Sequence, residues 1–147
     1  MKKAAAAEDR AAGCLFGLAL GDALGGPTEF LAVPEILRRW PPAGPAEPCG
    51  DPARMTDDTQ MALCVGEALA EALGSGNLPP GTLEPLLRSA FVEWSNSPDN
   101  NRPPGMTCLR ACEALSAGKH WLEATVKDSK GCGANMRVAE ASSQSNR

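Results

Sequence analysis

The residues best suited to chemistry in this chain form one short acidic cluster at the start of a long apolar segment. The cluster reads Met55-Thr56-Asp57-Asp58-Thr59-Gln60. Two adjacent carboxylates repel each other, and a divalent cation such as Mg²⁺ converts that repulsion into binding, with the threonine hydroxyls as further hard oxygen donors. Thr and Asp are also ordinary residues at helix starts, where they cap backbone amides. The cluster therefore predicts either half of a metal site or a helix cap.

A second informative segment, residues 10–30, lies upstream of this cluster and is largely apolar. It carries glycines at intervals of four residues: Gly13, Gly17, Gly21 and Gly25. This spacing places all four on one face of a predicted helix. Because Gly inside a helix costs about 0.5–1 kcal/mol relative to Ala, we expect a neighbouring backbone or a ligand to approach that face closely.

Two carboxylates belong to the same segment. Asp22 lies within its apolar part, so we expect its side chain to be hydrogen-bonded, bound to a metal or placed at an exposed helix end. The sequence Gly25-Gly26-Pro27 predicts the end of the helix, and Glu29 follows on a loop. Such a loop position suits a catalytic or gating carboxylate.

A third motif, Ser-Lys-Gly-Cys-Gly-Ala-Asn-Met-Arg-Val-Ala, occupies residues 129–139. Together with GDALGGPTEF at 21–30 and MTDDTQMAL at 55–63, in this order and at these separations, it resembles the ADP-ribosylglycohydrolase family, also called the dinitrogenase-reductase-activating glycohydrolase superfamily. Residues 101–107, Asn-Arg-Pro-Pro-Gly-Met-Thr, resemble the family's substrate-side loop. The resemblance covers about residues 10–139.

This resemblance implies an all-α fold around a binuclear Mg²⁺ site. It also implies a hydrolase that removes ADP-ribose from modified protein side chains or related ADP-ribosyl conjugates. Thr56, Asp57 and Asp58 resemble the family's first group of metal ligands. Glu29 resembles the glutamate near the cleft, so Glu29, Asp57 and Asp58 become the expected catalytic carboxylates.

The same resemblance implies where the substrate binds. The residues expected against ADP-ribose are Gly105, Ser129, Lys130, Gly131, Cys132 and Gly133. Glycine-rich turns allow backbone amides to approach a diphosphate, and nearby helix starts favour its negative charge. Lys130 and Arg137 either assist electrostatically or are solvated surface residues.

The chain departs from the family pattern at its end. Full-length members supply a second Asp-x-Asp-Thr cluster that completes the metal site, and no such cluster follows Ala139. We therefore expect a partial domain over residues 1–139, truncated at its C-terminus, and a polar, disordered tail over 140–147. An alternative to the hydrolase is a non-catalytic remnant that binds ADP-ribose or packs against a partner, either a second copy or a complementary C-terminal fragment. A third alternative is that the acidic cluster only caps a helix.

The composition fits one globular domain and excludes several partners. The chain has 147 residues, of which 43% are hydrophobic and 22% charged. A net charge of −4 without a basic run argues against nucleic-acid binding through a basic face. Charged residues 8–10 interrupt any signal peptide, and no stretch has the length of a membrane span, so we expect a cytoplasmic protein. The six cysteines are expected to be reduced, buried thiols.

The predicted elements are helices, and the motifs described above lie at the ends of these helices. Apolar residues recur every three or four positions over residues 60–73, which is typical of a core helix starting at the acidic cluster. The sequence predicts helices near 8–24, 58–73, 82–95, 105–117 and 119–128, with a helical turn near 34–40. No segment predicts a sheet.

Overall fold

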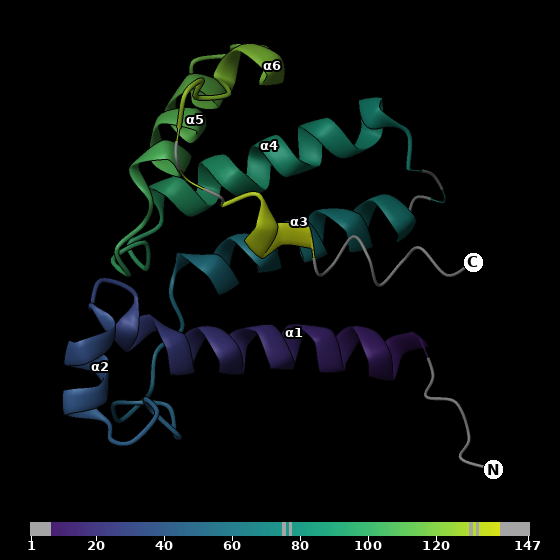
Figure 1. Ribbon diagram of the computed structural model, residues 1–147. Helices are drawn as coiled ribbons and strands as arrows, with labels where there is room; N and C mark the ends of the chain where they lie inside the picture. The colour runs from purple at the N-terminus through teal and green to yellow at the C-terminus, as the bar shows by residue number, and fades with distance from the viewer. Residues whose placement is uncertain (1–6, 75, 77, 130, 132, 139–147) are drawn as a thin grey trace.

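The computed structural model of the chain describes residues 7–74, 76, 78–129, 131 and 133–138. Throughout this part the chain is helical and contains no β-strand, which confirms the predicted all-α fold (Figure 1). The elements in order are α1 (Ala7–Gly25), the short 3₁₀ helix η1 (Gly26–Thr28), α2 (Val33–Arg39), α3 (Asp57–Gly74), α4 (Pro80–Asn96), α5 (Met106–Ser116), α6 (Trp121–Ala124) and the 3₁₀ helix η2 (Asn135–Arg137).

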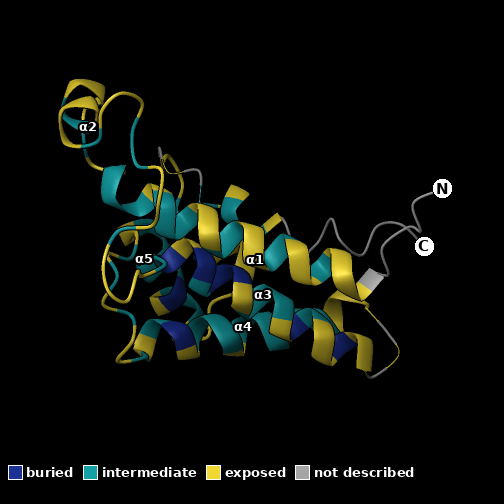
Figure 2. Cartoon of the chain, turned by 90° about the horizontal axis from the view of Figure 1, so that it is seen from below, coloured by how far each residue is buried: buried dark blue, intermediate teal, exposed yellow. Residues whose placement is uncertain are grey.

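Helix α3 is the centre of the fold. It packs against α1, α4 and η2, and α4 in turn carries α5 (Figure 1). Buried residues gather on α3 in Figure 2, and six of its side chains are buried: Asp57, Thr59, Met61, Ala62, Ala68 and Ala72. Met61 meets Trp94 of α4 and Cys112 of α5 in the core cluster. This core holds the first turns of α3 and α5 in place.

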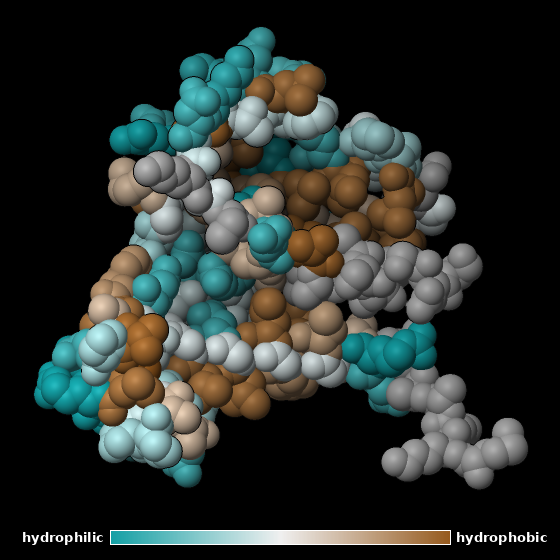
Figure 3. Space-filling model, in the orientation of Figure 1, coloured by the Kyte–Doolittle hydropathy of each residue, from teal (hydrophilic) through white to brown (hydrophobic). Residues whose placement is uncertain are grey.

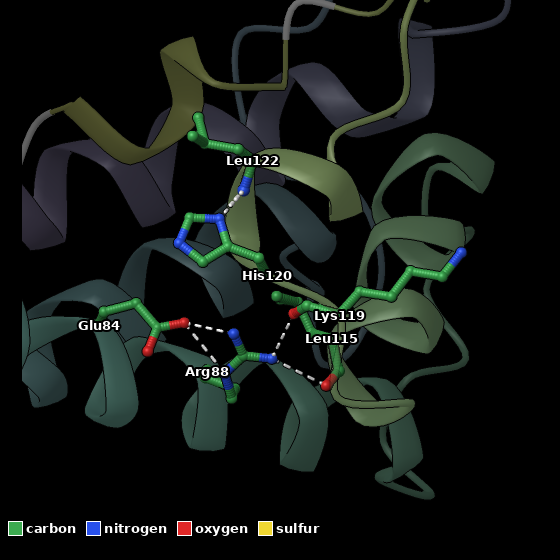
Figure 4. Close-up of polar contacts among 6 residues, drawn as sticks. All are labelled: Glu84, Arg88, Leu115, Lys119, His120 and Leu122. Carbon is green, nitrogen blue, oxygen red and sulfur yellow. Dashed lines mark hydrogen bonds and ion pairs between the residues drawn. The ribbon is translucent and has the colours of Figure 1, made fainter.

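Arg88 of α4 forms hydrogen bonds to the backbone at the end of α5. Its Nη1 donates to the carbonyl oxygens of Leu115 at 2.9 Å and Lys119 at 3.0 Å, while Nε donates to Glu84 at 3.0 Å (Figure 4). The last carbonyls of a helix have no partner within the helix, and a positive charge there is favourable. Leu115 also accepts from the amide of Gly118 at 3.0 Å, so Arg88 adds a second bond that ties the end of α5 and the following loop to α4.

The helix predicted over residues 119–128 is shorter in the structure. It spans only Trp121–Ala124, and the imidazole Nδ1 of His120 accepts a hydrogen bond from the backbone amide of Leu122 at its start. At its end Thr125 adopts an extended conformation, and its hydroxyl donates to the carbonyl of Leu122 at 2.5 Å. This side chain takes a carbonyl that a longer helix would use, so α6 ends after one turn.

The close approach predicted for the glycine face of α1 is wrong for the described part of the chain. A Cβ atom built on any of the four glycines would meet no atom there within 4 Å. Phe16 and Leu20, also on α1, are 78% and 60% exposed. The half-buried residues of α1, among them Leu15, Leu18 and Asp22, lie on the opposite side of the helix. The glycine face is therefore the outer face of α1.

The cysteines in the described chain form no disulfide, but the predicted burial holds fully only for Cys112, and the other four are half-buried. Burial raises the pKa of Cys64 and of Cys112 to about 11, so both are neutral thiols at physiological pH. Cys132 lies outside the described residues. None of the described helices combines the length and the apolar character needed to cross a membrane.

Candidate active site

The acidic cluster lies where α3 and α5 both begin. Asp57 is the first residue of α3, and its side chain is only 8% exposed. Its Oδ2 accepts a hydrogen bond from the amide of Gly105, the residue before α5, at 3.1 Å. Arg102 of the preceding loop donates from Nη1 to the carbonyl of Met55 at 3.1 Å. These contacts bring the predicted substrate-side loop against the predicted metal ligands.

Asp22 joins α1 to the same place. Its Oδ2 accepts hydrogen bonds from the amide of Thr56 at 2.8 Å, the amide of Thr59 at 3.2 Å and the hydroxyl of Thr59 at 2.5 Å. Its Oδ1 accepts from the hydroxyl of Thr56 at 2.8 Å. Of the alternatives left open by the sequence, hydrogen bonding is therefore the one observed. A carboxylate of α1 caps the first turn of α3.

Glu29 follows η1 and lies beside the same carboxylates. Its pKa is raised above the ordinary value, first by partial burial and then by the negative charges of Asp58, Asp57 and Asp22. Close packing of η1 against Thr56, the residue before α3, helps to set this position, because a Cβ on Gly26 would lie 3.0 Å from Cγ2 of Thr56. The structure thus brings the three predicted catalytic carboxylates into one neighbourhood.

Asp58 is the exposed partner of the buried Asp57. Partial burial, followed by the charges of Asp57 and Asp22, raises the pKa of Asp58, while Arg137 of η2 opposes this shift. The guanidinium of Arg137 is held by the carbonyl of Gly133 at 3.1 Å and stacks over the ring of Phe91, 5.3 Å from its centroid. Arg137 therefore places a fixed positive charge beside a surplus of negative ones.

The glycine-rich loop reaches the start of α5. The hydroxyl oxygens of Ser129 and Thr107 are 2.9 Å apart, and Ser129 also accepts from the amide of Gly131 at 3.1 Å. A Cβ on Gly133 would lie 3.6 Å from Sγ of Cys108, on the first turn of α5. The predicted substrate residues Gly105, Ser129, Gly131 and Gly133 therefore lie around one helix start. Lys130 and Cys132 fall outside the described residues.

The site is separate from the groove between α3 and α4. That groove has a volume of about 670 Å³, and none of the predicted catalytic or metal-binding residues lines it. The site lies instead at the ends of α1, α3 and α5. In Figure 3 the face seen in Figure 1 is hollowed above α1, and hydrophilic residues lie in the hollow.

The oxygen donors present suit a partial Mg²⁺ site. No three His, Cys, Asp or Glu side chains of the described residues converge to hold a metal ion by themselves. Mg²⁺, however, keeps several waters and commonly uses only one or two protein carboxylates. Thr56, Asp57 and Asp58 offer such a set. The pKa of Asp58 is raised first by partial burial and then by the charges of Asp57 and Asp22, and a cation would offset the repulsion between these charges. Mg²⁺ binding by these residues stays a prediction.

Sequence reasoning did not predict the hydrogen-bond partners of Asp22 and Thr107. A signal for Asp22 existed, because a carboxylate within an apolar stretch requires donors. The sequence could not show that Thr59 bonds Asp22, 37 residues away, or that Thr107 meets Ser129, 22 residues away.

Comparison with known proteins gives consistent relatives. A family model described as ADP-ribosylglycohydrolase matches residues 3–142. An uncharacterized protein of Archaeoglobus fulgidus is 34% identical over 140 residues, which cover 90% of this chain and 42% of the relative. The ADP-ribosylarginine hydrolase Tri1 of Serratia proteamaculans is 33% identical, with 91% of this chain and 36% of the relative covered. An ADP-ribosyl-[dinitrogen reductase] glycohydrolase of Rhodospirillum rubrum is 39% identical over 69% of this chain and 33% of the relative.

The match covers most of this chain but a smaller share of each relative. The chain spans between 33% and 42% of the length of these three curated proteins. No solved structure matches it significantly. The family match over nearly all residues, with the three sequence motifs gathered at one site, shows that the chain belongs to the ADP-ribosylglycohydrolase family.

Proposed function

We propose that this chain takes part in the Mg²⁺-dependent hydrolysis of ADP-ribosylated protein side chains or related ADP-ribosyl conjugates. The observation that carries this proposal is the meeting of Glu29, Asp57 and Asp58 at the start of α5, beside the Ser129 loop. The names of the Serratia and Rhodospirillum relatives supply the substrate class.

The start of α5 is suited to bind the diphosphate of ADP-ribose. Gly105 directs its amide to Asp57, and the next three amides, of residues 106–108, have no acceptor within the helix. Such amides, together with the helix dipole, bind phosphate groups. The hydroxyls of Thr107 and Ser129 lie beside them, and Arg137 adds a positive charge nearby. The negative charges of the carboxylate cluster would then face the ribose end of the substrate.

The carboxylates differ in ways that suit different tasks. Asp57 is buried and held by Gly105, so it is positioned as a fixed negative group. Asp58 and Glu29 are exposed, and their raised pKa values make them better proton acceptors than ordinary carboxylates. Negative charge at this point stabilises the oxocarbenium character of a glycosyl transition state. Bound to Thr56, Asp57 and Asp58, Mg²⁺ would supply positive charge that polarises oxygen ligands.

The test is release of ADP-ribose from an ADP-ribosylarginine peptide, measured with Mg²⁺ and with EDTA. We expect release only with Mg²⁺, and a loss of at least about 100-fold in Asp58→Asn. Asp9→Asn, at the far end of α1, is the matched control and should retain the activity. Full activity in Asp58→Asn would exclude the carboxylate assignment, and release undiminished by EDTA would exclude the metal requirement.

A non-catalytic role is the second candidate, and the outer face of α1 favours it. Phe16 and Leu20 are exposed beside a glycine face that no described residue covers, a combination that suits contact with another chain. Calorimetric titration with ADP-ribose, combined with sedimentation, separates the candidates. Mg²⁺-dependent binding without hydrolysis would favour an ADP-ribose-binding remnant. Self-association of folded protein without such binding would favour a partner-packing role.

A further inference from the structure

The carboxylate of Asp22 is held by four hydrogen bonds from two threonines. Two come from backbone amides and two from hydroxyls; three of them meet at Oδ2, and Oδ1 accepts only the bond from the Thr56 hydroxyl. Its α3 partners, Thr56 and Thr59, are the residue before the helix and the third residue within it. These four bonds all run to Thr56 and Thr59, so Asp22 acts on the start of α3 through these two partners.

The hydrogen bonds of the Thr56 hydroxyl define the direction in which its proton points. A threonine hydroxyl has one proton to donate and two lone pairs to accept with. The proton of Thr56 is directed to Oδ1 of Asp22 at 2.8 Å, and one lone pair accepts from the amide of Asp58 at 3.2 Å. One lone pair remains. A cation binds a hydroxyl only through a lone pair, with the proton turned away.

We propose that Asp22 is a positioning residue that orients the Thr56 hydroxyl for cation binding, by holding its proton away from the cation. This inference rests on the Mg²⁺ site of the proposed function. Groups that orient metal ligands from behind in this way typically contribute 10- to 100-fold to metal affinity. A purely structural cap would instead affect the stability of the first turn of α3, and would affect Mg²⁺ only through that stability.

Asp22→Asn reverses this hydrogen bond with little change of shape. An asparagine has one acceptor oxygen and one donor NH₂ group. If its oxygen takes the place of Oδ2, where three donors meet, its NH₂ faces the Thr56 hydroxyl and donates to it. The hydroxyl must then turn its own proton to the remaining direction, toward the cation. We expect Mg²⁺ affinity to fall at least about tenfold.

The experiment is a double-mutant cycle on Mg²⁺ affinity, measured by calorimetry, with the metal-free unfolding temperature of each variant recorded in parallel. The variants are Asp22→Asn, Thr56→Val and the double substitution. Because Asp22 acts through the Thr56 hydroxyl, we expect Asp22→Asn to cause no further loss of Mg²⁺ affinity once that hydroxyl is absent. Equal losses in the two backgrounds would overturn the proposal.

Thr59→Val is the matched control for a loss of Mg²⁺ affinity that arises only because the Asp22 cap at the start of α3 is weakened. It removes the hydroxyl bond from Thr59 to Asp22 and leaves the bond from Thr56 in place. We expect a lower unfolding temperature with Mg²⁺ affinity retained within about twofold. A tenfold loss of affinity in Thr59→Val would overturn the proposal, even if Asp22→Asn fails to fold. If Asp22→Asn binds Mg²⁺ as tightly as the unaltered chain, Asp22 has no positioning role, and the proposed metal site still stands. If the unaltered chain binds no Mg²⁺, the metal site itself is excluded.

Discussion

Asp22 and Arg88 both complete the end of a helix to which they do not belong. Asp22 of α1 accepts from the amides at the start of α3, and Arg88 of α4 donates to the carbonyl of Leu115 in the last turn of α5 and to that of Lys119 just beyond it. Arg88 is neutralised by Glu84, one turn earlier on its own helix. Asp22 instead adds its charge to a region that already holds Asp57, Asp58 and Glu29.

This difference separates a contact that serves folding from one that also serves a site. The Arg88 cluster satisfies helix carbonyls and leaves no surplus charge, so the fold alone accounts for it. The Asp22 cluster satisfies helix amides equally well but leaves a surplus of negative charge nearby. Surplus charge of this kind raises pKa values and is typical of sites that bind a counter-ion or move a proton.

Removing the Asp22 carboxylate should have the largest effect on stability. Asp22→Ala leaves the amides of Thr56 and Thr59 without their acceptor, at a part-buried position. We expect a loss of about 3 kcal/mol in the free energy of unfolding, measured with urea at pH 7 in EDTA. Asp9→Ala, near the exposed start of the same helix, should change it by less than about 1 kcal/mol. If the two variants lose equal stability, the cap is not what holds α1 to α3.

Removing the Arg88 guanidinium should have a smaller effect. Arg88→Met keeps most of the apolar stem and loses the bonds to Leu115 and Lys119, one of which is exposed to water. We expect a loss of about 1–2 kcal/mol in the free energy of unfolding, with no change in Mg²⁺ affinity. Arg110→Met on the exposed side of α5 is the control. Weaker Mg²⁺ binding in Arg88→Met would contradict the separation drawn between the two clusters.

The smallest effect should be a gain in stability, and it should depend on pH. The pKa of Asp58 is raised above its ordinary value of 3.8, so protonated Asp58 favours the folded state, and this contribution is lost as the pH rises through the raised pKa. Asp58→Asn cannot ionise. It should therefore stabilise the metal-free chain at pH 7 but not at pH 3.5, by less than about 1 kcal/mol because water screens the exposed carboxylate.

A matched substitution in the Arg88–Glu84 ion pair sharpens this test. Glu84→Gln removes the counter-charge of Arg88, so it should destabilise the chain at pH 7, opposite in sign to Asp58→Asn. Urea unfolding of both variants in EDTA, at pH 3.5 and pH 7, gives the comparison. A loss of stability in Asp58→Asn at pH 7 would show that the acidic cluster carries no unfavourable repulsion.

The sequence predicted where the helices begin and end better than it predicted the surroundings of α1. Helix periodicity located the start of α3 to within one residue, and the Gly-Gly-Pro stop placed Glu29 beyond α1, because both are local signals. The four bonds of Asp22 join residues 34 or 37 positions apart, so local reasoning could establish only that donors were needed. The glycine spacing in α1 predicted that the glycines share one helix face, but it could not show whether another element packs against that face. The early end of α6 depends on one hydroxyl of Thr125, which periodicity does not register.

The outward glycines of α1 have a consequence for motion. Three of them, Gly13, Gly17 and Gly21, lie inside the helix without a compensating contact in the described chain, and together they weaken it by about 1.5–3 kcal/mol relative to alanines. A helix weakened in this way opens locally more often than α3, and each opening that reaches Asp22 releases the amides of Thr56 and Thr59 to solvent. The hydrogen-exchange rate of these two amides should therefore report the opening of α1, a helix to which neither belongs.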